Sequence, residues 1–364
     1  MGKTFHTFFT IALAGGAAIT TAAWYAGPVR ADAYVASWNI KRLGHGDSKD
    51  YAALAEVGAR FDLIAAQEVM TEDGAERMLV ALEARTGADW ELMLSDAIGR
   101  GSYKEMYGFF WRTDEVEWVD GAIVYIDDRD VFAREPFSAR FRAIEDDYTF
   151  VLGSVHIIYG DSVAERETEV AALRSYRDWL DETFRGSDVY IAGDFNLPPD
   201  NEAWAGMGAL AAPLITSGAT TLSETDGRFA NLYDNIWVPT GGILPIAGAG
   251  ILNFANETLG ISHAVARDTV SDHAPVWMKI DAAAKGIEFE GRPAAMIASG
   301  ASTEKVATPA ASPAIGGEIQ GNRNSKIYHL PGCASYDKTA ERNRVLFTTE
   351  AEAAAAGFRR ARNC

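Results

Sequence analysis

Short apolar segments alternate with amphipathic segments between residues 34 and 280. Compact apolar runs predict strands, and apolar residues that recur every three or four positions predict helices. The predicted strands cover residues 34–40, 63–69, 106–112, 150–158, 189–192, 235–238 and 274–280, and the predicted helices cover residues 49–60, 75–86 and 162–184. Strands and helices mixed in this order predict a layered α/β domain whose sheets are covered by helices.

The stretch GSYKEMYGFFWR (101–112) has large side chains at every second position, which is the period of a strand. These alternate positions are Tyr103, Glu105, Tyr107, Phe109 and Trp111. The four aromatic residues are expected to face a core. A buried carboxylate is costly unless it is paired or hydrogen-bonded. We therefore expect Glu105 either at a solvated strand end or in contact with a partner group.

The first residues of the 364-residue chain differ in composition from this central region. No Lys, Arg, Asp or Glu occurs between Lys3 and Arg30, and the small-residue triplet 31–33 follows. An apolar segment with this arrangement is typical of a secretory signal peptide. We expect residues 1–33 to be cleaved from a secreted or periplasmic protein. An uncleaved membrane anchor is the alternative, since the uncharged segment is long enough to span a bilayer.

The composition changes again after the predicted layered domain, residues 34–281. Residues 282–317 are dominated by Ala, Gly, Ser, Thr and Pro, which predicts a flexible linker. Residues 318–364 form a predicted small module with eight Lys or Arg against five Asp or Glu, whereas the whole chain has a net charge of −18. An acidic chain does not capture nucleic acid by simple electrostatics, although divalent cations can hold a polyanion on it. The basic module is either a polyanion-binding accessory or an ordinary charged surface.

The only two cysteines, Cys333 and Cys364, lie in this module. In an exported chain such a pair predicts a disulfide. A metal site that includes His329 is the alternative, although zinc usually takes four ligands.

Ionisable and polar residues follow several of the predicted strands, at positions where α/β proteins build functional sites. The stretches are SWNI (37–40), AAQEV (65–69), GSVHII (153–158), AGDFN (192–196), YDNIWV (233–238) and SDHAPV (271–276). Asn39, Glu68 and Asp272 offer oxygen ligands to a hard divalent cation. Two histidines suit proton transfer to and from a phosphodiester, and each needs a carboxylate to fix its tautomer. The set therefore matches the needs of phosphodiester hydrolysis.

These ordered motifs resemble the endonuclease/exonuclease/phosphatase superfamily and, within it, the secreted deoxyribonuclease I branch. The general superfamily residues are Asn39, Glu68, His156, Asp194, Asn196, Asp272 and His273. Four stretches resemble the deoxyribonuclease I branch more specifically, namely SYKEMY (102–107), AREPF (133–137), YDNI (233–236) and ILNFANETLGIS (251–262). The resemblance implies a four-layer sandwich of two mixed β-sheets with outer helices, followed by the small C-terminal module.

The resemblance also implies a role for each site residue. Glu105 would orient His156, and Asp234 would orient His273. The two acid–histidine pairs would flank the scissile phosphate and act as general base and general acid. Tyr103 and Arg134 would contact substrate phosphates. Asp194 and Asn196 would hold the attacked phosphate and its water. The metal ligands would be Asn39, Glu68 and Asp272, and the ion Mg²⁺, with Mn²⁺ or Ca²⁺ as alternatives.

We accordingly expect a secreted, monomeric, metal-dependent endonuclease that acts on DNA. A sphingomyelinase-type phospholipase C of the same superfamily is the alternative, although it would need an exposed aromatic hairpin that the sequence does not show. Met70 stands where the resemblance leads us to expect an arginine that reaches the minor groove, which changes a shape-sensing contact. The last 45 residues resemble a module appended to bacterial secreted nucleases, but the four-cysteine zinc set of its relatives is not reproduced.

Overall fold

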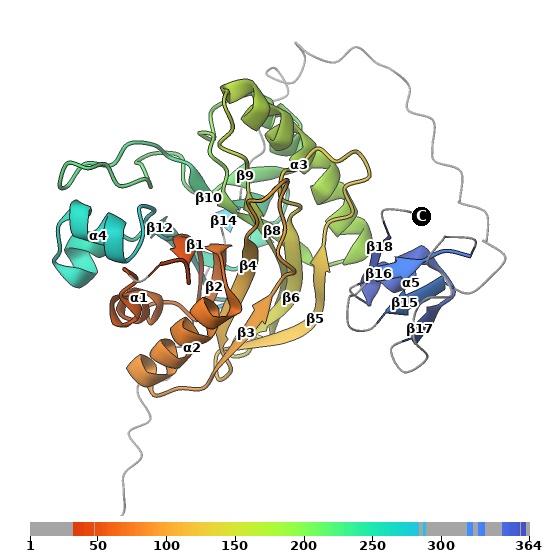
Figure 1. Ribbon diagram of the computed structural model, residues 1–364, viewed down its shortest axis with the longest axis horizontal. Helices are drawn as coiled ribbons and strands as arrows, with labels where there is room; N and C mark the ends of the chain where they lie inside the picture. The colour runs from red at the N-terminus through yellow and green to blue at the C-terminus, as the bar shows by residue number, and fades with distance from the viewer. Residues whose placement is uncertain are drawn as a thin grey trace, which may run out of the picture. The chain divides into compact units, whose positions relative to one another are not determined.

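The computed structural model describes residues 32–46, 48–283, 287–288, 319–322, 327–331, 344–356 and 358–361 (Figure 1). Almost all of the predicted signal peptide, most of the predicted linker, and both cysteines lie outside these residues. The signal peptide and the disulfide therefore stay predictions. None of the described helices combines the length and hydropathy needed to cross a membrane.

Two six-stranded mixed sheets form the centre of the catalytic domain. The first sheet has the order β12-β13-β1-β2-β4-β3, with β1 (Ala33–Leu43), β2 (Leu63–Val69), β3 (Trp90–Leu94), β4 (Met106–Arg112), β12 (Ile246–Ile251) and β13 (Val276–Ile280). The second sheet has the order β5-β6-β7-β8-β10-β9, with β5 (Val116–Val124), β6 (Phe137–Ala143), β7 (Tyr148–His156), β8 (Asp188–Asp194), β9 (Ala211–Pro213) and β10 (Asp234–Pro239). Only β1–β2 and β7–β8 are parallel pairs within these two sheets.

Helices cover the outer faces of both sheets, on opposite sides in Figure 1. The helices of the domain are α1 (Tyr51–Gly58), α2 (Glu72–Thr86), α3 (Val163–Thr183) and α4 (His263–Thr269), with the 3-10 helices η1 (Glu202–Ala205) and η2 (Met207–Ala209) and the π-helix η3 (Phe254–Leu259). Residues of α1 and α2 pack with the first sheet, and residues of α3 pack with the second. A third apolar cluster lies between the sheets. The predicted four-layer sandwich is confirmed.

The aromatic row of β4 contributes to the core between the sheets. Tyr107, Phe109 and Trp111 are almost fully buried there, and the ring centroid of Phe109 lies 5.4 Å from that of Phe137. Tyr103 does not join them: it is 39% exposed, because β4 begins only at Met106 and Tyr103 lies in the irregular segment before it. The expectation that all four aromatic residues face a core was therefore wrong for Tyr103.

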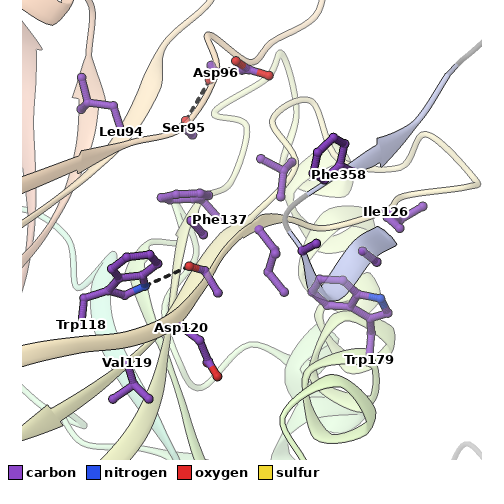
Figure 2. Close-up of a pocket in the computed structure, with 16 residues that line it drawn as sticks. Leu94, Ser95, Asp96, Trp118, Val119, Asp120, Ile126, Phe137, Trp179 and Phe358 are labelled. Carbon is purple, nitrogen blue, oxygen red and sulfur yellow. Dashed lines mark hydrogen bonds between the residues drawn. The ribbon is translucent and has the colours of Figure 1, made fainter. Parts of the chain in front are cut away.

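Several elements have no counterpart among the predicted ones, and β5 shows why. This edge strand shifts register twice along β6, once between Trp118 and Asp120 and again between Gly121 and Ile123. Each bulge breaks the period-2 alternation on which the prediction relies. The Trp118 indole, 44% exposed, donates to the Gly121 carbonyl across 2.9 Å (Figure 2). Strands β3, β6 and β12 and helix α4 were likewise not predicted.

The described residues of the C-terminal module form a small sheet of their own. Its order is β17-β15-β16-β18, with β15 (Ile319–Asn322), β16 (Ile327–His329), β17 (Arg344–Phe347), β18 (Arg359–Arg360) and the helix α5 (Glu350–Ala355). Ile319, Tyr328, Phe347 and Phe358 belong to a separate apolar cluster. Within the segment predicted as a linker, β14 (Ile287–Glu288) pairs with β11 (Ile243–Leu244), so that segment contains a short strand.

Candidate active site

Strand ends from both sheets bring the predicted site residues together. The parallel pairs β1–β2 and β7–β8 place their carboxyl ends at a common edge of each sheet, and β10 starts opposite the end of β8, pairing Asp234 with Asp194. At or next to a strand end lie Glu68, Glu105, His156, Asp194 and Asp234, whereas Asn39 lies where β1 shifts register against β2 and His273 lies in the segment before β13. A hydrogen bond of 3.1 Å from Asn39 Nδ2 to Asp194 Oδ2 joins the two sheets at this edge.

Glu105 and His156 form the first acid–histidine pair. Glu105 Oε1 lies 2.6 Å from His156 Nδ1, and the Tyr103 hydroxyl donates to Glu105 Oε2 across 3.1 Å. Arg134 Nε lies 3.6 Å from the same carboxylate. Glu105 is only 1% exposed, so of the two alternatives for this carboxylate the structure shows contact with a partner group and not a solvated strand end.

Burial and the neighbouring charges shift the pKa values of both Glu105 and His156. Burial raises the pKa of Glu105, but His156 and Arg134 outweigh burial and hold that pKa below its ordinary value. Burial and Arg134 lower the pKa of His156, yet Glu105 and Asp194 outweigh them and raise it above its ordinary value. The pair is therefore stabilised as carboxylate and imidazolium.

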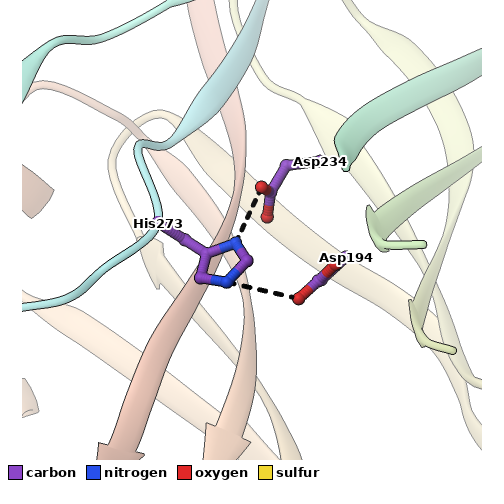
Figure 3. Close-up of side chains that lie close together, drawn as sticks. All are labelled: Asp194, Asp234 and His273. Atoms are coloured by element: carbon purple, nitrogen blue, oxygen red, sulfur yellow. Dashed lines mark hydrogen bonds and ion pairs between the residues drawn. The ribbon is translucent and has the colours of Figure 1, made fainter. Parts of the chain in front are cut away.

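Asp234 and His273 form the second pair, shown in Figure 3. Asp234 Oδ2 lies 2.8 Å from His273 Nδ1. Burial disfavours the charged ring, but Asp234 and Asp194 raise the pKa of His273 to about 10. Asp194 Oδ2 lies 3.6 Å from His273 Nε2 and 3.7 Å from His156 Nε2. One carboxylate thus stands between the free nitrogens of both imidazoles.

The segment 194–196 turns sharply at the site. The Asn196 backbone N–H donates to Asp194 Oδ1 across 2.9 Å, and Asn196 Nδ2 donates to the Ile157 carbonyl across 2.8 Å. Phe195 is 1% exposed and packs inward. Asn196 has a φ of +49°, so the chain leaves the extended conformation here. Backbone strain of this kind persists where the surrounding structure holds it.

The three predicted metal ligands are not equally placed. Asn39 Nδ2 donates to Glu68 Oε1 across 3.1 Å as well as to Asp194, so the Asn39 amide bridges the two carboxylates. Asp272 Oδ2 instead lies 3.4 Å from Lys41 Nζ and 3.9 Å from Arg267 Nη2. Two cations thus face the carboxylate of Asp272.

The closest set of potential metal-ligating atoms is not the predicted set Asn39, Glu68 and Asp272. Among the described residues, the ligand atoms of Asp194, Asp234 and His273 lie within 4.8 Å of one another. The carboxylate oxygens of this group fit a hard divalent cation. Asn39 links Asp194 of the group to Glu68 through its two hydrogen bonds.

Two residues of α3 hold the loops around the site, and the sequence analysis did not single them out. Glu169, 2% exposed, accepts the backbone N–H groups of Ala133 at 2.7 Å and Ile158 at 2.9 Å. Arg166 donates to the carbonyls of Tyr159 and Asn196 across 2.6 and 3.3 Å. Their spacing of three residues puts them on one helix face, which is the signal that could have indicated them.

Arg134, predicted to contact a substrate phosphate, also has an internal role. Its guanidinium donates to the carbonyls of His156 and Ile157, both across 3.1 Å, and its residue is 8% exposed. It therefore supports the end of β7 from behind His156. Contact of Arg134 with phosphate stays a prediction, whereas Tyr103 is exposed beside Glu105, where a substrate can reach it.

Comparisons with known proteins agree with this geometry. The chain is 52% identical over 256 residues to a deoxyribonuclease of Thioalkalivibrio sp. (strain K90mix). The aligned region covers 68% of this chain and 71% of that relative. It is 28% identical over 267 residues to human deoxyribonuclease-1, covering 66% of this chain and 90% of the relative. A solved endonuclease/exonuclease/phosphatase family protein from Bacteroides thetaiotaomicron has the same fold, with a TM-score of 0.51, 14% identity, and coverage of 68% of this chain and 97% of the other. The family described as ArfC matches residues 299–360.

The two facing sheets and the two acid–histidine pairs at their common edge are those of an endonuclease/exonuclease/phosphatase protein. Within that class the chain belongs to the deoxyribonuclease I-like family, and it is a hydrolytic nuclease.

Proposed function

We propose that this nuclease is an exported, divalent-metal-dependent endonuclease that hydrolyses DNA by direct attack of water on the phosphodiester. The proposal rests above all on the symmetric arrangement about Asp194. Both histidines use Nδ1 toward a carboxylate, at 2.6 and 2.8 Å, and direct Nε2 toward Asp194. A base and an acid therefore flank a single reacting position.

This arrangement supplies the proton transfers of hydrolysis. One imidazole takes the proton of the attacking water, and the other returns a proton to the leaving alkoxide. Glu105 and Asp234 hold the tautomer and stabilise each ring when it is charged. Asp194 accepts a hydrogen bond from the attacking water, and Asn196 holds the attacked phosphate beside it. None of these steps needs a covalent intermediate.

The oxygen donors of the site fit Mg²⁺, with Mn²⁺ or Ca²⁺ as alternatives. Asn39 contacts both Glu68 and Asp194 at the edge where β8 ends, and Asp272 lies on the segment before β13, 3.4 Å from Lys41 Nζ. A divalent cation bound there would neutralise negative charge that develops on the phosphate. The same cation would offset the repulsion between the substrate and a chain of net charge −18.

The relatives support DNA as the substrate. Proteins named deoxyribonuclease match the chain from bacterial and vertebrate sources, at 52% and 28% identity in the two cases given above. The apolar N-terminal segment supports export. N-terminal sequencing of secreted material tests export: a start at Met1 would contradict cleavage.

The decisive experiment compares substrates and cations. Purified protein is incubated with supercoiled plasmid, RNA or sphingomyelin, each with Mg²⁺, Ca²⁺ or EDTA. Nicked and then linear plasmid with Mg²⁺, and none with EDTA, is expected of a metal-dependent endonuclease. Cleavage of sphingomyelin in place of DNA would support the phospholipase alternative.

A histidine variant separates this activity from contaminating nuclease. His156→Ala should abolish cleavage, whereas His45→Ala, which removes an exposed imidazole, should leave it unchanged. A His156→Ala protein that cuts plasmid at the wild-type rate would overturn the proposed mechanism.

A further inference from the structure

An exposed tyrosine stands beside the site without a role in the proposed hydrolysis. Tyr159 follows His156 by three residues, and its side chain is 61% exposed. Among the described residues only Tyr159 and Tyr103 are exposed tyrosines, and both flank the Glu105–His156 pair along the chain. An exposed aromatic ring next to a nuclease site offers a face on which a base can stack.

One face of the Tyr159 ring rests on a buried cation. The guanidinium carbon of Arg166 lies 3.9 Å from the ring centroid, and Arg166 Nε donates to the Tyr159 carbonyl. Arg166 is only 9% exposed, and its Nη1 also lies 3.4 Å from the Tyr233 hydroxyl. Arg166 therefore fixes both the ring and its backbone, and leaves the rest of the ring open to solvent.

The loop that carries Tyr159 is anchored on both sides of the ring. The Ile158 N–H donates to Glu169 Oε2 across 2.9 Å. Gly160 has a φ of +60°, a left-handed conformation that favours glycine, and a Cβ there would lie 3.2 Å from the Cβ of Glu165 on α3. An aromatic ring held in this way loses little conformational entropy on binding.

We propose that Tyr159 stacks on an unpaired base next to the scissile phosphate and so strengthens the binding of single-stranded or frayed DNA. This inference rests on the proposed function. Aromatic rings bind single strands by stacking on bases without reading their sequence. In an intact duplex both faces of each base are already covered, so stacking on Tyr159 requires unstacking first. Stacking also needs no basic surface, which suits a strongly acidic chain.

The test compares Tyr159→Ala, Tyr159→Phe and Val80→Ala in the full chain, with a labelled single-stranded oligonucleotide and the matching duplex. Val80 lies on α2 and is 62% exposed, so its variant controls for the loss of exposed apolar surface. Tyr159→Ala should raise KM for the single strand about tenfold and change the duplex value by less than about twofold. Tyr159→Phe keeps a stacking ring and should behave as the wild type, as should Val80→Ala.

Abasic positions introduced one at a time into the oligonucleotide sharpen the test. At one position beside the cleaved bond, loss of the base should weaken wild-type cleavage and leave Tyr159→Ala unaffected, because the contact is already absent. Equal losses on single strand and duplex, no loss, or an abasic effect that persists in Tyr159→Ala would overturn the inference. A wild-type protein that cuts neither DNA would instead overturn the proposed function.

Discussion

Replacing Glu105 by Gln tests the pairing on which the site depends. The change keeps the shape of the side chain and removes the charge that faces His156 Nδ1 at 2.6 Å. Removing one partner of a buried charge pair costs about 3–5 kcal/mol of folding stability. The effect on the rate is separate: a general acid or base contributes about 10²- to 10⁴-fold, so kcat should fall by about that factor when His156 loses the carboxylate that orients it.

The direction of the pH effect follows from the charges around His156. Glu105 and Asp194 raise its pKa, whereas burial and Arg134 lower it. Without the Glu105 carboxylate, burial and Arg134 lower the pKa of His156 with less opposition. The limb of the pH–rate profile that belongs to His156 should therefore move to lower pH in Glu105→Gln.

The assay is plasmid nicking under saturating DNA with Mg²⁺, followed across pH. Glu91→Gln is the matched control, because Glu91 is an exposed carboxylate on β3 of the same sheet. A kcat within about tenfold of the wild type, together with an unmoved pH limb, would refute the reasoning, since a general acid or base normally contributes about 10²-fold or more.

Three further changes test other parts of the structure. Because the pKa of Glu105 lies below its ordinary value of 4.5, its carboxylate stabilises the fold above that pH. The free energy of unfolding of the wild type should therefore approach that of Glu105→Gln as the pH falls below 4.5, as urea titrations at several pH values would show; a constant difference would contradict this. Phe109→Ala removes a fully buried ring and should lower the free energy of unfolding by about 3–5 kcal/mol in urea denaturation, against less than about 0.5 kcal/mol for Val80→Ala. Glu169→Gln leaves one of two backbone N–H groups without its acceptor, which should cost about 1–3 kcal/mol and also lower kcat; unchanged kcat would limit Glu169 to a structural role.

Local periodicity was sufficient to predict the regular strands of the sandwich. The bounds of β2 and β4 agree with the predicted residues 63–69 and 106–112, because both strands are continuous and strongly apolar. The predicted helix 162–184 corresponds to α3, which Ser162 caps by accepting the Glu165 N–H. Where bulges interrupt the alternation, as in β5, the pattern fails.

The types of the site residues were also visible in the sequence, and the resemblance implied both acid–histidine pairs. Their geometry was not visible, because the partners are far apart in the chain. Glu105 and His156 are 51 residues apart, Asp234 and His273 are 39 apart, and Asn39 and Asp194 are 155 apart. Such contacts form only when two sheets pack face to face and their strand ends meet.

By itself the sequence determined which residue types stand at the strand ends, since side-chain chemistry and local period are properties of neighbouring residues. The tertiary structure alone decided that Asp194 lies between two imidazoles, that Asp272 faces Lys41 and Arg267, and that Arg166 supports the exposed ring of Tyr159. The physical reason is that distance, burial and charge at a site depend on long-range packing, which no local pattern encodes.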